Sequence, residues 1–135
     1  MRVFLCSFDG FLIAIPMDSV SSICIYNKVQ HNEDNRNTYV SLPMLFNLQS
    51  EIRNSIVLKK PNANEDDSDG NKTILLSTRV EREEEIHDGE FFPIPKTLNK
   101  TLFSALFSGV LFVSQPVFLL NSDYFINKAN KEASA

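Results

Sequence analysis

His31 and His87 are the side chains best suited to acid–base or nucleophilic chemistry in this chain of 135 residues. A catalytic histidine needs a nucleophile beside it and a partner that orients its ring. Both histidines stand in polar segments, and although Glu85 and Asp88 flank His87, neighbours in sequence are rarely partners in space. We therefore expect both histidines to be solvated surface residues.

Carboxylates gather at residues 81–85 and 66–70. Paired carboxylates act in acid–base catalysis when one of them lies in an apolar pocket. Residues 81–85 are instead expected to form a solvated face. The second run lacks the alternating ligands and distal glutamate of a calcium loop. Cys6 and Cys24 both sit inside apolar runs and are expected to be buried free thiols. Two cysteines and two distant histidines are too few for a metal site, so we expect no metal and no cofactor.

Other features exclude several classes of function. The four glycines form no cluster for a phosphate-binding loop, and no Gly-x-Ser-x-Gly nucleophile motif occurs. The net charge is -4, without any basic run, which argues against nucleic acid and against an anionic membrane surface. No apolar run approaches the ~18 residues of a membrane helix, and no signal-peptide cleavage site follows the N-terminus. We expect a cytoplasmic protein that is not an enzyme and is not inserted in a membrane.

Short β-prone runs separated by turns make up most of the chain. Two such runs flank Asp9-Gly10 and predict a hairpin. Pro43 can open a short helix that carries Met44, and the polar residues 30–38 predict an exposed loop. Strands are expected at residues 2–8, 11–15, 22–29, 39–42, 55–58, 73–80, 106–113 and 117–120. Eight short strands indicate an all-β barrel or sandwich.

The chain is expected to be a single domain over residues 1–127. Residues 61–72 are rich in Asn, Asp, Glu and Gly and predict a mobile acidic loop within it. Residues 128–135 predict a disordered tail.

The order of these segments resembles the CheW-like chemotaxis coupling domains over about residues 3–126. No single match is specific, and the order and spacing carry the resemblance. The matching segments are the hairpin that ends in Ala14-Ile15-Pro16, residues 17–23, Tyr39-Val40-Ser41-Leu42, the short helix over residues 44–48, Ser55-Ile56-Val57-Leu58, residues 74–80, Glu85-Ile86, Phe91-Phe92-Pro93-Ile94-Pro95, Ser108-Gly109-Val110 and residues 117–125.

The resemblance implies two packed five-stranded SH3-like barrels, of which one is shortened. It also implies a non-enzymatic adaptor that docks to a CheA-type histidine kinase and to chemoreceptors in bacterial chemotaxis signalling. The matching segments nominate five contact residues: Val20, Ile23, Met44, Ile56 and Val80. The competing interpretation is that most of these side chains fill the barrel cores.

The chain departs from the family pattern at three places, one of which is the acidic loop over residues 61–72. The Gly-x-x-Asn-x-Arg-Gly segment typical of the family is missing between Tyr26 and Tyr39, and Thr78 stands where an Asp is usual. Two alternatives therefore remain: a repurposed CheW-like module that binds another regulator, and a small β-barrel that binds a ligand or stabilises an assembly. An apolar pocket with converging polar groups would favour ligand binding. Exposed apolar strand edges or patches would favour docking.

Overall fold

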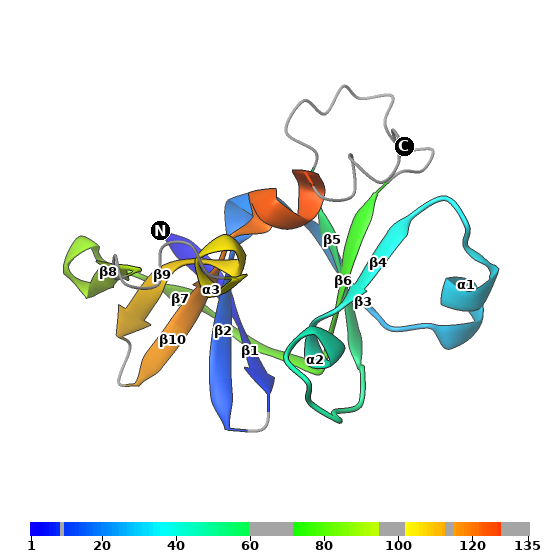
Figure 1. Ribbon diagram of the computed structural model, residues 1–135, viewed down its shortest axis with the longest axis horizontal. Coiled ribbons are helices and arrows are strands. Elements are labelled where there is room, and N and C mark those ends of the chain that lie inside the picture. Colours follow the sequence, from blue (N-terminus) through cyan, green and yellow to red (C-terminus); the bar gives the residue numbers. More distant parts are fainter. Residues whose placement is uncertain (9, 60–71, 95–101, 113–114, 128–135) are drawn as a thin grey trace.

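The chain folds into two β-sheets that pack side by side (Figure 1). The computed structural model describes residues 1–8, 10–59, 72–94, 102–112 and 115–127. Its strands are β1 (Arg2–Phe8), β2 (Phe11–Pro16), β3 (Val20–Ile25), β4 (Thr38–Ser41), β5 (Asn54–Leu58), β6 (Thr73–Ser77), β7 (Arg79–Glu85), β8 (Phe91–Pro93), β9 (Phe107–Phe112) and β10 (Pro116–Leu120).

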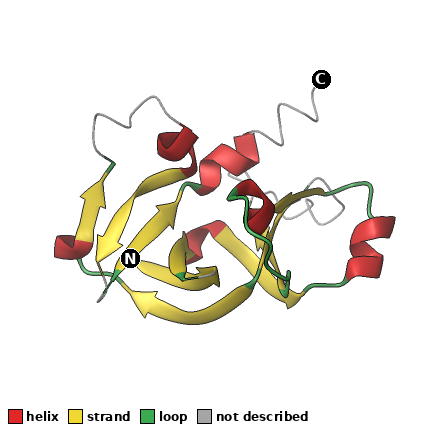
Figure 2. Cartoon of the chain, turned by 60° about the horizontal axis from the view of Figure 1, so that its bottom comes forward, coloured by secondary structure: helices red, strands yellow, loops and turns green. Residues whose placement is uncertain are grey.

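One sheet has six strands in the order β7-β1-β2-β10-β9-β8, and the other has four in the order β3-β5-β6-β4. The predicted all-β fold in two packed units is confirmed, with the strands divided six to four. Pairings among the described residues leave both sheets open. Figure 2 shows that strands predominate and that the helical segments are short. The helical segments are η1 (Met17–Ser19), α1 (Lys28–Glu33), α2 (Leu42–Leu45), η3 (Asp88–Glu90), α3 (Leu102–Leu106) and residues 122–127.

The predicted hairpin is present as β1 and β2, with Phe8 opposite Phe11 at the turn. Gly10 has a φ of 99°, a left-handed conformation that glycine adopts without steric cost. The hairpin lies at the centre of the six-stranded sheet, because β7 pairs with β1 and β10 pairs in parallel with β2. Strands from both ends of the described chain thus meet in one sheet.

The strand predicted over residues 73–80 is two strands that belong to different sheets. β6 lies in the four-stranded sheet and β7 at the edge of the six-stranded one. Thr78 stands between them, is buried, and donates a hydrogen bond from its hydroxyl to the backbone carbonyl of Ser7 in β1. The charged run at residues 81–85 continues the second strand and is mostly exposed. Charged side chains on an edge strand discourage pairing with other chains.

The predicted loop at residues 30–38 contains most of α1, so that prediction is wrong in its secondary structure. Asn27 caps the helix, since its side-chain oxygen accepts a hydrogen bond from the Gln30 backbone N–H at 3.1 Å. Val29 is the one apolar residue of α1, so the sequence has no apolar periodicity from which this helix could be predicted. The predicted mobile loop, apart from Lys72, and the predicted tail lie outside the described residues.

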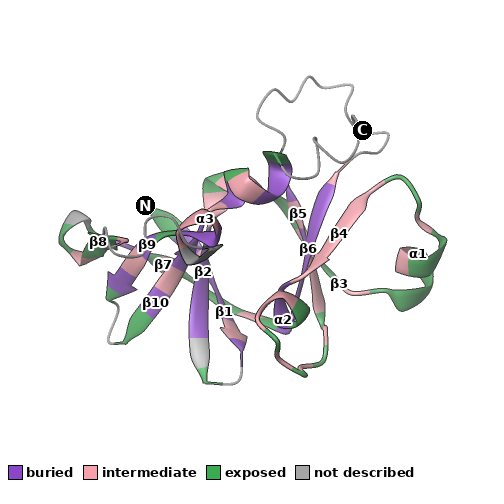
Figure 3. Ribbon diagram, in the orientation of Figure 1, coloured by how far each residue is buried: buried purple, intermediate pink, exposed green. Residues whose placement is uncertain are grey.

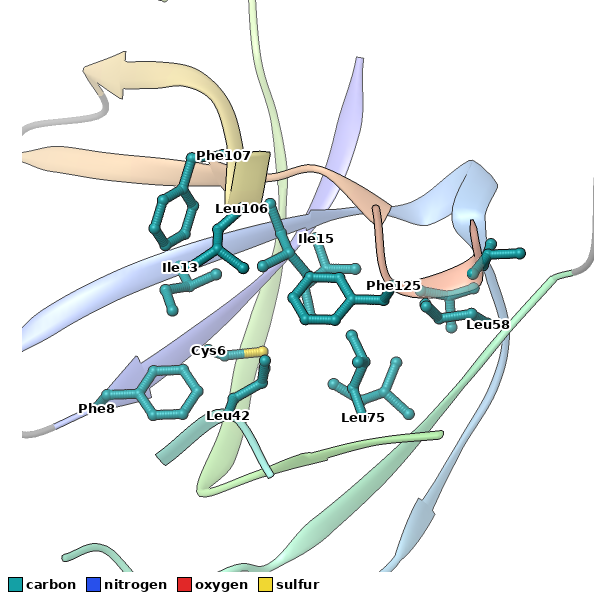
Figure 4. Packing of buried hydrophobic residues seen from close by; sticks show 14 residues of the cluster. Cys6, Phe8, Ile13, Ile15, Leu42, Leu58, Leu75, Leu106, Phe107 and Phe125 are labelled. Carbon is teal, nitrogen blue, oxygen red and sulfur yellow. The ribbon is translucent and has the colours of Figure 1, made fainter. Parts of the chain in front are cut away.

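One apolar cluster joins the two sheets (Figure 4). Alternate residues of a strand point to opposite faces, so Cys6 and Phe8 of β1 face this cluster while Val3 and Leu5 face a second one. The shared cluster comprises Cys6, Phe8, Ile13, Ile15, Val20, Leu42, Ile56, Leu58, Leu75, Leu106, Phe107, Leu120, Phe125 and Ile126. Apolar burial thereby fixes the position of one sheet against the other.

Candidate protein interface

His31 lies between two tyrosines rather than in solvent, so its predicted solvated position is wrong. Its ring stacks on Tyr39 of β4 with centroids 4.0 Å apart and planes inclined by 29°. Its Nδ1 atom is 2.6 Å from the hydroxyl of Tyr26, with which it shares a hydrogen bond. His87 is exposed, as expected. His31 thus holds α1 against β4, and its visible contacts are structural.

Asp34 closes the turn between α1 and β4. Its carboxylate accepts hydrogen bonds from the backbone N–H groups of Arg36 and Asn37, from the Asn37 amide, and from the Tyr39 hydroxyl at 2.7 Å. The bond from Tyr39, followed by that from Arg36, lowers the pKa of Asp34 to about 2. Burial, followed by the hydrogen bond to Asp34, raises the pKa of Tyr39 to about 12. These groups satisfy one another and stabilise a turn.

The two cysteines differ in exposure. Cys6 is buried as predicted, and this burial raises the pKa of its thiol to about 12. Cys24 is exposed on β3, so its predicted burial is wrong. Within the part of the chain that the structure describes, no group of three or more His, Cys, Asp or Glu side chains could hold a metal ion.

Figure 3 colours the ribbon by three classes of exposure, and the five nominated contact residues are divided among all three. Val20 and Ile56 belong to the shared core, and Ile56 has 0% of its surface exposed. Ile23 and Val80 are half-buried and pack against that core. Met44, on α2, is 79% exposed. Of the five side chains, only that of Met44 is fully available to a partner.

Three of the nominated residues gather around β5. Ile23 stands opposite Ile56 in the ladder between β3 and β5. The backbone N–H of Val80 donates to the Asn54 side-chain oxygen at the start of β5, at 3.1 Å. Met44 belongs to a different element, since α2 follows β4 at the far edge of the same sheet.

Two groups of exposed apolar residues were not nominated from the sequence. Ile25 of β3 and Val29 of α1 are 86% and 65% exposed. Phe91, Phe92 and Phe112 are the exposed aromatic residues of β8 and β9, and the rings of Phe92 and Phe112 meet edge to face with centroids 5.2 Å apart. Ile25 and the three phenylalanines occur in or beside apolar runs, which sequence patterns assign to the core, whereas Val29 stands alone between Lys28 and Gln30. Their exposure depends on strand order, which those patterns do not contain.

An open depression of about 430 Å³ lies where β1, β7 and the segment before β5 meet. Its lining is polar: Ser7, Gln49, Ser50, Glu51, Arg53, Thr78, Arg79 and Glu81. Arg53 and Glu51 form an exposed ion pair at 3.8 Å. Such a lining differs from the apolar pocket with a few polar groups that typifies small-molecule sites.

In the described part of the chain, no helix is long and apolar enough to span a membrane. No protein-family model matches the chain, and no curated protein matches its sequence. Among solved structures, the fold is similar to that of the scaffolding protein TtCheW from Thermoanaerobacter tengcongensis, with a TM-score of 0.62. The similarity covers 89% of this chain and 83% of that one, at 14% sequence identity. The expected resemblance is thus present in three dimensions, and the chain has a CheW-like fold.

Proposed function

We propose that the chain is a non-enzymatic adaptor that docks to a CheA-type histidine kinase, to chemoreceptors, or to both, in the cytoplasm of a bacterium. The observation that carries this proposal is the CheW-like fold, which extends over 89% of the chain and is shared with a scaffolding protein. The polar lining of the depression and the satisfied hydrogen bonds around His31 and Asp34 agree with a role in binding rather than catalysis.

Met44 is the proposed anchor of the docking surface. Exposed apolar side chains ringed by polar surface are typical of protein interfaces, and methionine adapts its shape to a partner. Ser41 caps α2 by accepting a hydrogen bond from the Met44 backbone N–H at 3.3 Å, which fixes the start of the helix. Ile23 and Val80 are proposed as flanking contacts, while Val20 and Ile56 would support the surface from within the core.

The proposal is tested by titrating the chain with the regulatory domain of a CheA kinase from the same genome, with calorimetry as the readout. We expect saturable binding that Met44→Lys weakens by about tenfold or more, because an anchor residue contributes more than ~1.4 kcal/mol. Val29→Lys is the matched control, since it adds the same charge at another exposed apolar position. Ile56→Asp is unsuitable, because a buried carboxylate without a partner would destabilise the whole fold.

Absence of binding by folded wild-type protein would contradict the kinase-docking role. Equal loss of affinity in Met44→Lys and Val29→Lys would show that added charge, rather than α2, weakens the complex. Titration with the cytoplasmic tip of a receptor from the same genome separates receptor coupling from kinase docking.

One observation favours a repurposed module that binds another regulator. The segment between Tyr26 and Tyr39, where the typical family motif is missing, is built as α1 and is held by contacts of its own. A partner that recognises the usual motif would meet a different surface here. Co-purification from the native organism, followed by mass spectrometry, would then recover a regulator other than the kinase or receptor.

A further inference from the structure

The four edge strands of the two sheets differ in how well they are protected against pairing with a strand of another chain. β7 carries six charged residues among seven, β8 has three residues and ends in Pro93, and β4 has four residues that are all half-buried. β3 has six residues without charge, proline or glycine, and Ser21, Ser22, Cys24 and Ile25 are exposed. Natural proteins normally blunt an exposed edge with charge, proline or a short strand. β3 lacks all three of these protections.

Among the described residues no strand pairs with the outer side of β3, and the backbone of β3 presents hydrogen-bonding groups there. The N–H of Tyr26, the residue after β3, donates to the Arg53 carbonyl at 2.9 Å. In an antiparallel ladder, the residues whose backbone groups face the partner strand alternate with those whose groups face away. Cys24 therefore turns its N–H and C=O toward β5, whereas Ile23 and Ile25 turn theirs away from the sheet.

We propose that two copies of this chain associate by pairing their β3 strands antiparallel, about a two-fold axis at Cys24. In this register Ile23 stands opposite Ile25 of the second copy, and the outward backbone groups of both residues are hydrogen-bonded. In this register the Ile23-Cys24-Ile25 segments of the two β3 strands face each other and join one sheet to the next, and Ile25, which is 86% exposed in the single chain, is covered by Ile23 of the second copy.

The sequence of β3 indicates that the partner of this strand is a second copy of the same chain. Ile23-Cys24-Ile25 is symmetric about its central residue, so the same surface serves both sides of a two-fold contact. Although each chain carries a net charge of -4, no charge lies on β3, so like charges do not meet directly across the paired strands. A short strand pair covers less than a standard interface, and the dimer is therefore weak and depends on concentration.

The first test is sedimentation equilibrium of the whole chain over a range of concentrations. Wild type is expected to form a dimer, and Ile25→Lys, which gives β3 the charge it lacks, is expected to weaken self-association by at least about tenfold. Met44→Lys adds the same charge to another exposed position and is expected to leave the dimer intact. Monomeric wild type, or an Ile25→Lys variant as dimeric as wild type, overturns the proposal.

The second test reports the register through Cys24. Directly opposed residues of a non-hydrogen-bonded pair have Cα atoms ~4.5 Å apart, within the disulfide range. Diamide oxidises two Cys24 thiols to one disulfide, and the two electrons and two protons reduce its N=N bond to a hydrazine. We expect a covalent dimer on a non-reducing gel, with a Cys24–Cys24 peptide in the mass spectrum.

The matched control moves the thiol along the same strand. In Cys24→Ser/Ser22→Cys the two thiols would lie four residues apart along the paired strands, roughly 13 Å, which is too far for a disulfide. Equal cross-linking of this variant, or of Ile25→Lys, would show random collision and overturn the pairing. Loss of kinase binding in Met44→Lys with the dimer retained separates this inference from the proposed adaptor role.

Discussion

His31 and Tyr39 stack face to face, with ring centroids 4.0 Å apart, and this contact joins α1 to the edge strand β4. Aromatic pairs of this kind add about 0.5–1.5 kcal/mol beyond the burial of their surface. We expect His31→Ala to lower the free energy of unfolding by about 1 kcal/mol in urea titrations and to speed amide exchange in α1.

Asn32→Ala is the control for that experiment, because Asn32 is exposed on the same helix. If both variants lose the same stability, the loss reflects α1 itself and not the stack.

The turn at Asp34 predicts a pH dependence of stability. The pKa of Asp34 falls from its ordinary value of 3.8 to about 2 in the folded chain. A carboxyl with a lowered folded pKa stabilises the fold above its unfolded pKa, and this contribution disappears as the pH falls through the folded value. The unfolding free energies of wild type and Asp34→Asn should therefore differ at pH 5. They should converge as the pH falls from about 4 to about 2. A gap that stays constant down to pH 2 would contradict the assignment.

Gly109 leaves room for the ring of Phe91. A Cβ atom at residue 109 would collide with that ring and would lie 2.7 Å from the backbone carbonyl oxygen of Phe92. Gly109→Ala should therefore cost about 1–3 kcal/mol of stability or displace β8 from β9. Chemical denaturation and amide exchange in β8 measure the two outcomes. Gly89→Ala is the control, since a Cβ there meets no atom within 4 Å.

Thr78 links the two sheets at the point where the chain passes from one to the other. Its hydroxyl donates to the Ser7 carbonyl, so Thr78→Val leaves that carbonyl without its partner at nearly unchanged volume. We expect a loss of about 1–3 kcal/mol in thermal or urea unfolding, whereas Thr78→Ser, which keeps the hydroxyl, should retain most of the stability. Wild-type stability in Thr78→Val would exclude a role for this bond.

The features that the sequence predicted well are local in origin. The hairpin of β1 and β2 depends on a two-residue turn between β-prone runs, and both parts are visible in a short window. The break at Thr78 was missed because residues on both sides favour strand, and the change of sheet depends on distant partners. α1 was missed because its stability comes from the Asn27 cap and the His31 stack rather than from an apolar face.

The candidate interface was harder to predict, for a related reason. Val20 and Ile56 occur in apolar segments like those of Ile25 and Cys24, yet the first two lie in the core and the last two are exposed. An apolar pattern identifies a strand but does not show whether that strand lies at the centre or at the edge of a sheet. The edge position of β3 follows from pairings with residues about thirty positions later, which no local pattern reports.

The parallel pairing of β2 with β10 has a consequence for biosynthesis. Leu12 meets Val117, so about a hundred residues must be translated before the centre of the six-stranded sheet can close. At roughly 5–20 residues per second, the apolar faces of β1 and β2 wait for several seconds on the ribosome without their final neighbour. Contacts this distant also slow folding itself, because the chain must close a long loop before the pairing can stabilise it. The nascent chain is therefore expected to depend on chaperones until its last strand emerges.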